Sequence, residues 1–447
     1  MRRTSWLILA CASLLHLGLL VGWRWQAPLV PYFFDATVLS GGRGLDFYSV
    51  YQAGYNARHG QDIYEGDPSR VHVVVPYFTP YRYLPPMAYT VGAALSLVAP
   101  LRAYEIWVVT VELTLLACVA ATYWYTRYDL DLLARLAAMW LVFTPYYLEL
   151  FMGQFSLVQG ALVFAMLLAA TTIASGQASP ADPSSRPGRW FDAVWIGSVL
   201  WKINTIVFIP VQFRLRRWRA LVAGAVVVAG LTLPYFVVFP AHWSDFINNN
   251  FGSTVAGHEL GNLGFRQLVY ETLSVAGASP LVQRIAQLAV VGVVAVLALL
   301  LTLLPRQARI TTLLSLWLTA FFLISPQVWE HHYVMLLPVL VIAYRQRPNW
   351  QVAGLWLLLA LPTPFGFTSL QSTIAANHDL RAFALQPVWA LLLQHASKAV
   401  PAVLLFAYLA ADAVRAPQVS SPAVAPRVSM PTAATASNSP KPAASQC

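Results

Sequence analysis

Eleven apolar runs divide this chain, and each is long enough to cross all or most of a lipid bilayer. The runs lie at 5–22, 105–125, 132–148, 157–174, 191–213, 220–239, 284–304, 310–324, 333–344, 351–367 and 388–412. Charged residues make up only 10% of the chain, whereas soluble domains carry about 25%. The sequence therefore predicts an all-α polytopic integral membrane protein with about 11–12 transmembrane helices, some shorter than a standard span.

The basic residues give the chain a net charge of +10, which in a soluble protein would suggest binding to nucleic acid. Here they lie in short loops between the apolar runs, as the positive-inside rule describes for cytoplasmic loops. We therefore expect no nucleic-acid partner. The first run follows Arg2 and Arg3 and could be a signal peptide, but no small-x-small cleavage site follows it. We interpret it as an uncleaved first span.

Two arrangements in the membrane fit the hydropathy, because the runs 86–101 and 191–213 are ambiguous. In the first arrangement, 86–101 lies at the interface and 191–213 breaks at Lys202 into two half-length helices. In the second, both runs are simple spans, which moves the arginines between 127 and 189 to the outside. The first arrangement obeys the positive-inside rule better, so we expect it. It places both termini inside and residues 24–104 and 240–283 outside.

Residues 1–412 thus form the predicted membrane domain, with large outer loops that carry interfacial helices. Residues 413–447 are rich in Pro, Ala and Ser and lack apolar periodicity, which predicts a disordered cytoplasmic tail. The first outer loop is far longer than a connection between two helices requires. Its carboxylates, arginines and aromatic residues indicate a site of chemistry at the membrane face.

Asp46 in this loop is a candidate general base, because an ionised carboxylate can accept a proton from a sugar hydroxyl. The neighbouring Arg43 would favour the ionised form. The alternative is a helix N-cap, since the stretch FYSVYQAGYNAR that follows looks amphipathic.

Lys202 and several loop arginines are candidate phosphate ligands, because cations bind anionic head groups readily. The arginines are Arg43, Arg58, Arg70 and Arg82. The positions of the arginines are explained equally well by snorkelling, in which a long side chain extends its charge to the membrane interface. It explains Lys202 less well, because this lysine lies in the middle of an apolar run.

Two further segments carry polar side chains at the ends of spans. Gly153-Gln154 combines close approach of a backbone with an amide that can bind sugar hydroxyls. The run SPQVWEHHYVMLLP, residues 325–338, contains adjacent histidines that point in different directions on a helix, so it does not form a metal pair. A polar role beside a cavity and an interfacial aromatic belt are both compatible with this run.

The order of these motifs resembles glycosyltransferase family 87, whose members have the membrane-embedded GT-C fold. The matching features of the first outer loop are Asp46 followed by tyrosines, Gly60, Ile63-Tyr64 and Tyr83-x-Pro85-Pro86. Later features are Gly153-Gln154, Lys202 before a basic loop, and Ser325-Pro326-x-x-Trp329-x-His331-His332. The resemblance covers roughly residues 40–345. Two positions depart from the family pattern, because Phe155-Ser156 stands in place of a polar Asn and Ile203 in place of a proline.

The resemblance implies a polyprenyl-phosphate-linked sugar donor, with mannose or a related hexose, and a lipid or envelope glycan acceptor. It implies an inverting transfer at the outer face of a bacterial inner or plasma membrane, with Asp46 as the base. Lys202, Arg43 and Arg82 would bind the donor phosphate. The implied contacts to sugar or acceptor are Tyr48, Tyr64, Tyr83, Gln154, Trp329, Glu330, His331 and His332.

We expect no cofactor and no metal ion. The three cysteines do not form a ligand cluster, and Asp129-Leu130-Asp131 falls on the cytoplasmic side. A transporter or flippase for a lipid-linked sugar is the alternative function, although such proteins tend to show inverted repeats and midplane polar residues. A non-catalytic scaffold that binds polyprenyl phosphate is a third possibility, and Asp46 argues against it.

Overall fold

The computed structural model describes residues 3–25, 43–126, 129–172, 186–251, 261–304, 308–363 and 387–415. These residues form helices joined by turns and loops, with one isolated β-bridge between Asn262 and Trp329. The first half contains α1 (Arg3–Arg24), α3 (Leu45–Arg58), η2 (Pro68–Arg70), α4 (Pro85–Met87), η3 (Ala88–Gly92), α5 (Ala93–Leu95), α6 (Pro100–Tyr125), α7 (Leu130–Leu141), α8 (Pro145–Met152), α9 (Ser156–Thr172), α10 (Arg186–Trp201), η5 (Ile203–Phe208) and α11 (Ile209–Arg214). The second half contains α12 (Trp218–Val238), α13 (His242–Phe251), α14 (Phe265–Val275), α15 (Pro280–Leu303), α16 (Ile310–Ile324), η6 (Glu330–Leu336), α17 (Leu337–Gln346), α18 (Trp350–Ala360) and α21 (Val388–Arg415).

The described residues include five helices that are long and apolar enough to cross a membrane, namely α1, α6, α12, α15 and α21. Three shorter apolar helices, α9, α16 and α18, accompany them. The expected class, an all-α polytopic membrane protein with some short helices, is confirmed. Two predicted spans consist of paired short elements, since α7 with α8 covers 132–148 and η6 with α17 covers 333–344.

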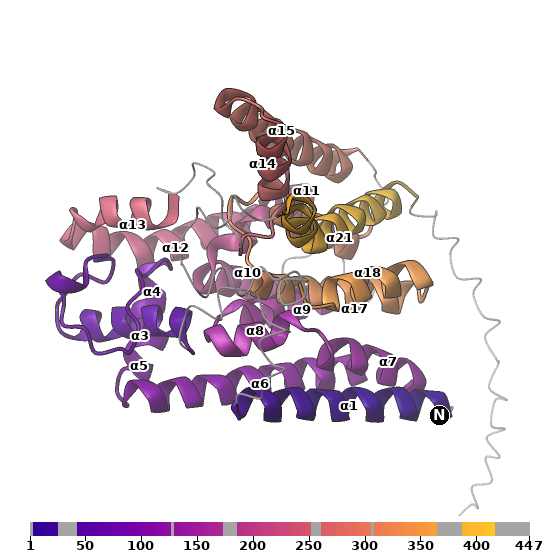
Figure 1. The fold of residues 1–447 in the computed structure, drawn as a ribbon, viewed down its shortest axis with the longest axis horizontal. Coiled ribbons are helices and arrows are strands. Elements are labelled where there is room, and N and C mark those ends of the chain that lie inside the picture. Colours follow the sequence, from indigo (N-terminus) through magenta and orange to yellow (C-terminus); the bar gives the residue numbers. More distant parts are fainter. Residues whose placement is uncertain are drawn as a thin grey trace, which may run out of the picture.

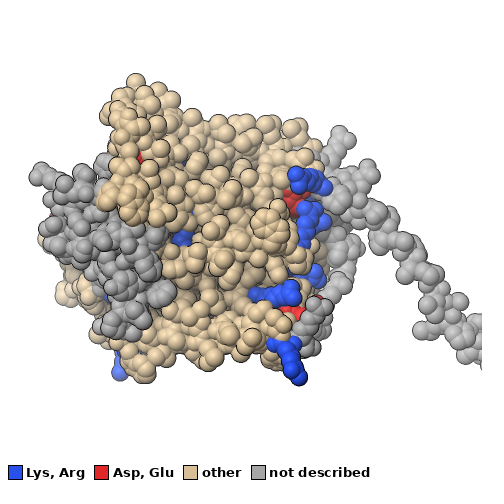
Figure 2. All heavy atoms as spheres, turned by 45° about the vertical axis from the view of Figure 1, so that its right-hand side comes forward, with Lys and Arg blue, Asp and Glu red and all other residues tan. Residues whose placement is uncertain are grey.

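Basic residues gather at one end of the molecule, which we call the basic end. There Arg347 forms an ion pair of 2.5 Å with Asp412 in the last turns of α21. The guanidinium of Arg345 lies 5.5 Å from the ring centroid of Tyr125, the last residue of α6. In Figure 2 most of the visible Lys and Arg side chains lie at one side of a surface that is otherwise largely uncharged. This is the charge distribution that the positive-inside rule predicts for a cytoplasmic face.

The long loops lie at the opposite end, which we call the loop end. Helices α3, α4, α5 and α13 lie at the left of Figure 1, whereas the N-terminus and the ends of α18 and α21 lie at the right. The hydroxyl of Tyr51 on α3 donates to the carbonyl of Val98 just before α6. The predicted first outer loop is thus bonded to the residues just before α6.

The run 191–213 forms a hairpin that enters and leaves at the basic end, with Lys202 at its tip. Lys202 has extended backbone angles (φ −156°, ψ 121°) between α10 and η5. At the base, the guanidinium of Arg217 binds both carboxylate oxygens of Asp192, at 2.7 and 2.9 Å, and the carbonyl of Gly188. The break at Lys202 predicted by the first arrangement is confirmed, and the simple span of the second arrangement is wrong.

The hairpin is deep. Helix α10 has 16 residues, so it is about 24 Å long at 1.5 Å per residue. The hydrocarbon core of a bilayer is about 30 Å thick. The indole of Trp195 donates to the carbonyl of Thr205 and joins the two arms. Lys202 therefore lies close to the loop end and far from the base of the hairpin.

The other ambiguous run, 86–101, contains one short bent helix made of α4, η3 and α5. It extends from Pro85 to Leu95 and is about 16 Å long, about half the thickness of the hydrocarbon core. It packs against α3, where two glycines meet: a Cβ on Gly54 would lie 1.9 Å from the carbonyl carbon of Gly92. The contact fixes α3, the helix that carries Asp46, against this short helix.

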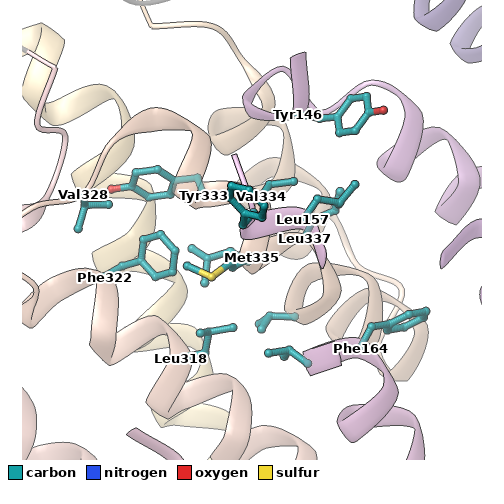
Figure 3. Close-up of a cluster of buried hydrophobic side chains, with 14 of the residues drawn as sticks. Tyr146, Leu157, Phe164, Leu318, Phe322, Val328, Tyr333, Val334, Met335 and Leu337 are labelled. Carbon is teal, nitrogen blue, oxygen red and sulfur yellow. The ribbon is translucent and has the colours of Figure 1, made fainter. Parts of the chain in front are cut away.

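The buried core surrounds η6 and α17. Every residue from Tyr333 to Leu337 is fully buried, and Figure 3 shows several of them packed between α9 and α16. The hydroxyl of Tyr333 donates to the carbonyl of Leu263. Because His331 and His332 directly precede this segment, their backbone is anchored to a fully buried part of the core.

The predicted tail lies almost wholly outside the described residues, which end at Arg415 in α21. Parts of both predicted outer loops, 26–42 and 252–260, also lie outside them.

Candidate active site

Asp46 lies in the first turn of α3, at the loop end. The turn before the helix depends on Gly44, whose φ of 80° favours glycine and whose N–H donates to the carbonyl of Phe151. Gly44 occupies the N-cap position without a side-chain cap, so Asp46 does not have the N-cap role considered from the sequence. A carboxylate in the first turn interacts favourably with the helix dipole, and it remains available for chemistry.

Burial raises the pKa of Asp46, because removal from water disfavours the ionised carboxylate. A hydrogen bond from Gln154 and the positive charges of Lys202 and Arg82 act in the opposite direction. Three predicted site residues, Gln154, Lys202 and Arg82, therefore lie close enough to the candidate base to affect its pKa. A general base works best with a pKa near the operating pH, and burial moves Asp46 in that direction.

Gln154 is positioned by the junction between α8 and α9. Gly153 ends α8 with a φ of 64°, and a Cβ there would lie 2.5 Å from the Cβ of Phe47. The Oε1 of Gln154 accepts a hydrogen bond of 3.2 Å from the hydroxyl of Tyr83. Its amide group therefore remains to donate to Asp46.

Lys202 reaches the same junction from the tip of the hairpin. Its Nζ donates a hydrogen bond of 3.0 Å to Oγ of Ser156 and lies 5.9 Å from the ring centroid of Tyr83. Its carbonyl accepts a hydrogen bond of 2.6 Å from Nε2 of Gln159. The ammonium thus lies beside Ser156 and the ring of Tyr83, and it interacts with the charges of Glu149 and Asp46.

The two histidines complete the site from η6. The pKa values of His331 and His332 are held well below the usual range by burial and by the charge of Lys202. Nδ1 of His332 accepts a hydrogen bond of 3.2 Å from the N–H of Trp329, so a neutral ring carries its proton on Nε2. Nε2 of His331 is buried and has no hydrogen-bond partner within the described part of the chain. We call the set Asp46, Arg82, Tyr83, Gln154, Lys202, His331 and His332 the loop-end site.

Other predicted contacts lie elsewhere. Arg43 donates to the carbonyl of Trp23 and lies over its ring. Tyr48 packs among Phe47, Tyr77 and Tyr104, and burial raises its pKa to about 12.

Tyr64 and the start of η6 also serve the scaffold. Tyr64 is fully buried, and its hydroxyl donates to the carbonyl of Tyr83. This hydrogen bond holds the backbone of Tyr83, a residue of the loop-end site. Glu330 forms a buried ion pair of 3.1 Å with Lys398 on α21. Trp329 is half-buried at the start of η6, where its backbone binds His332. Of the remaining loop arginines, Arg58 binds Ser96 and Arg70 is exposed beside Glu65 and Asp67.

Two residues beside the loop-end site, Glu149 and Ser156, were not among the site residues predicted from the sequence. Glu149 is fully buried on α8 and accepts a hydrogen bond of 2.7 Å from the N–H of Leu157. Glu149 and Asp46, which lie outside the run 191–213, both interact with the charge of Lys202. A glutamate inside the apolar stretch LELFM was the available signal.

Within the described ranges, no group of three or more His, Cys, Asp or Glu side chains could hold a metal ion. Asp129 of the Asp-x-Asp triplet caps α7, since its carboxylate accepts from the N–H groups of Asp131 and Leu132. That triplet therefore has a structural role in this fold.

Taken together, the fold and the loop-end site define a polytopic α-helical membrane protein with a carboxylate, an amide, an ammonium and two imidazoles at one face. The family model for glycosyltransferase family 87 matches residues 82–326. This is more than half of the chain, so the chain belongs to glycosyltransferase family 87 and is a membrane glycosyltransferase. Comparison with curated proteins and with solved structures gave no match.

Proposed function

We propose that the protein transfers a hexose, mannose or a close relative, from a polyprenyl-phosphate donor to a lipid or envelope glycan acceptor. The observation that carries this proposal is the grouping of Asp46, Gln154 and Lys202, which supplies a base and a cation in one site. The fold is consistent with the GT-C superfamily. A donor with a long lipid would explain why the site lies at the end of a bundle of apolar helices.

The proposed reaction is a single displacement with inversion. Asp46 accepts the proton of the acceptor hydroxyl while that oxygen forms a bond to the anomeric carbon. The bond between the anomeric carbon and the phosphate oxygen breaks, and polyprenyl phosphate leaves with the electron pair. Lys202 stabilises the negative charge on the leaving phosphate. Arg82, whose guanidinium bonds Gln327 at the rim of the site, is the second proposed phosphate ligand.

The outer face of a cell membrane is the proposed location of the site. The loop-end site lies opposite the basic end, and the positive-inside rule assigns basic ends to the cytoplasm. Neutral His332 can donate from Nε2 to a sugar hydroxyl or a phosphate oxygen. Tyr83, Gln154 and His331 are the remaining proposed contacts to sugar or acceptor.

Transfer from radiolabelled polyprenyl-phosphate sugars to a membrane lipid extract tests this function with the purified protein. We expect label in the lipid fraction for wild type and a loss of about 10²–10⁴-fold in rate for Asp46→Asn. The matched control is Asp67→Asn, because Asp67 lies on the same loop, has a half-exposed side chain and caps η2. Transfer by Asp46→Asn at the wild-type rate would exclude Asp46 as the base, and the absence of transfer from every donor by wild type would exclude the proposed donor class.

A further inference from the structure

The last long helix, α21, carries two buried polar side chains that contact the segments around the site histidines. His395 and Lys398 are both 0% exposed. They lie three positions apart in the helix, so they project from the same face. Helix α21 is long and apolar enough to cross a membrane, and a polar side chain in such a helix is costly unless it is bonded. Both residues lie outside 82–326, the part of the chain that the family model matches, so the family match assigns them no role.

Lys398 has a partner for each of its three N–H donors. Its Nζ donates to the carbonyl of Leu359 at 2.7 Å and to the carbonyl of Leu361, both at the end of α18. It also forms the ion pair of 3.1 Å with Oε1 of Glu330. An ammonium has three donors and no acceptor, so these three partners fix its position. Because Glu330 is the first residue of η6 and directly precedes His331, Lys398 holds the start of η6 against α18.

His395 contacts the chain on the other side of α21. Its Nδ1 lies 2.8 Å from the backbone carbonyl of Asn262. A carbonyl can only accept, so Nδ1 carries a proton and donates it to this bond. Nε2 of His395 lies 4.0 Å from Oε1 of Glu271, which accepts a hydrogen bond of 2.8 Å from Gln267 on the same helix, α14. His395 therefore connects α21 both to α14 and to the residues just before α14.

Asn262 in turn bonds the segment that precedes the two site histidines. Its Oδ1 accepts from the N–H of Val328 at 3.0 Å, and its Nδ2 donates to the carbonyl of Pro326 at 2.8 Å. The next residue, Leu263, donates from its N–H to the carbonyl of Val328 at 2.7 Å. The segment from Pro326 to Val328 is thus held by both the side chain and the backbone of its neighbour.

The same contacts reach the ring of His332. The backbone of Asn262 forms the β-bridge with Trp329, and the N–H of Trp329 donates to Nδ1 of His332 at 3.2 Å. A series of bonded groups therefore leads from His395 on α21, through Asn262 and Trp329, to the imidazole of His332. Lys398 acts in parallel on the residue that precedes His331.

We propose that His395 and Lys398 are positioning residues of the loop-end site. His395 holds the peptide that orients His332, and Lys398 holds the residue before His331. Together they keep the two imidazoles directed at the substrate. Contact between these imidazoles and a sugar or phosphate rests on the proposed function, whereas the anchoring of residues 325–332 by α21 does not.

Hydrogen–deuterium exchange tests the anchoring without any substrate. His395→Leu removes the donor to Asn262, so the backbone amides of 262–264 and 328–332 should exchange faster than in wild type, whereas those of α3 should not change. His395→Asn should restore slow exchange, because its amide nitrogen is a donor close to the position of Nδ1. Exchange as slow as in wild type for the Leu variant, or equally fast exchange in both variants, would overturn the anchoring role of the hydrogen bond.

Kinetics of transfer test the positioning, at a temperature at which every variant is folded. A residue that only supports the fold would change the Tm and leave kcat/KM as in wild type. We expect His395→Leu to lower kcat/KM by about 10²-fold, and His395→Asn to recover most of that loss. Wild-type kcat/KM in the Leu variant would overturn the assignment of His395.

The ion pair is tested with a single and a double variant. Lys398→Met leaves Glu330 buried without its counter-ion, so the Tm should fall. Adding Glu330→Gln removes the unpaired charge and should restore the Tm, but kcat/KM should stay low, because the neutral pair no longer holds η6 to α18. Recovery of both the Tm and kcat/KM in the double variant would show that the pair is structural and would overturn the assignment of Lys398.

Ser397→Ala is the matched control. Ser397 lies between His395 and Lys398 in the sequence, but its hydroxyl donates to the carbonyl of Gln394 in its own helix at 2.7 Å. This variant should leave amide exchange, Tm and kcat/KM unchanged. If wild type transferred no sugar from any donor, the proposed function would fail, and the exchange experiment would still decide the anchoring.

Discussion

The hydroxyl of Tyr83 donates a hydrogen bond of 3.2 Å to Oε1 of Gln154. The N–H of Phe155 donates to the same oxygen at 3.3 Å. Two donors on one oxygen fix the orientation of the amide, so that its NH₂ group is left for Asp46. The bond connects the motif Tyr83-x-Pro85-Pro86 to the motif Gly153-Gln154, two segments that the sequence keeps far apart.

The first prediction concerns pH. Asp46 acts as a base only when ionised, so kcat/KM should fall as the pH drops through its pKa. The hydrogen bond from Gln154 lowers that pKa, and Gln154→Leu should raise it. The acid limb of the pH profile should therefore move to higher pH, measured as kcat/KM from pH 4 to pH 9. A loss of the same size at every pH would show that Gln154 acts on something other than the ionisation of Asp46.

The second prediction concerns the phosphate ligand. Lys202→Met removes a charge-assisted hydrogen bond worth about 1.5–3 kcal/mol, so the affinity for polyprenyl phosphate should fall by about 10–100-fold. Lys202→Arg should retain part of the affinity, because a planar fork replaces a compact ammonium. Native mass spectrometry with added polyprenyl phosphate measures both. Unchanged affinity in the Met variant would leave phosphate binding to Arg82 and the histidines.

The third prediction concerns the glycine contact between α3 and the helix from Pro85 to Leu95. A Cβ at Gly54 would overlap the backbone of Gly92, so Gly54→Ala should destabilise the protein by about 1–3 kcal/mol and reduce transfer by displacing Asp46. Gly197→Ala is the control, because a Cβ at Gly197 on α10 meets nothing within 4 Å. Thermal unfolding should give a lower Tm for the first variant and an equal or higher Tm for the second. Equal Tm values for the two variants would mean that the close contact at Gly54 does not contribute to stability.

The fourth prediction concerns sidedness. Ser69 is exposed at the loop end and Arg219 at the basic end. In a background without the natural cysteines, a membrane-impermeant thiol reagent applied to intact cells should label Ser69→Cys and spare Arg219→Cys. Both should be labelled after the membrane is opened. Labelling of Arg219→Cys in intact cells would reverse the proposed orientation.

The helical class and the break at Lys202 could be predicted, because apolar runs and charge asymmetry are local properties of the sequence. The positions of Asp46, Gln154 and Lys202 in one site followed only from motif order, since nothing local brings residues 46, 154 and 202 together. Glu330 and Arg43 carry charges that could bind a substrate. In the fold, however, Glu330 forms an ion pair with Lys398, and Arg43 donates to the carbonyl of Trp23. Lys398 lies 68 positions after Glu330 in a different helix, and no pattern in the sequence announces such a pair.

The hairpin also has a consequence for how the chain is inserted during synthesis. A segment that turns back does not change the side on which the next residue emerges, whereas a segment that crosses does. If the insertion machinery treated 191–213 as one crossing, every helix from α12 to α21 would be threaded in the reverse direction. The half of the protein that carries His331 and His332 would then face away from the half that carries Asp46. Because the hairpin closed by Arg217 and Asp192 turns back, the two halves of the site lie on the same side.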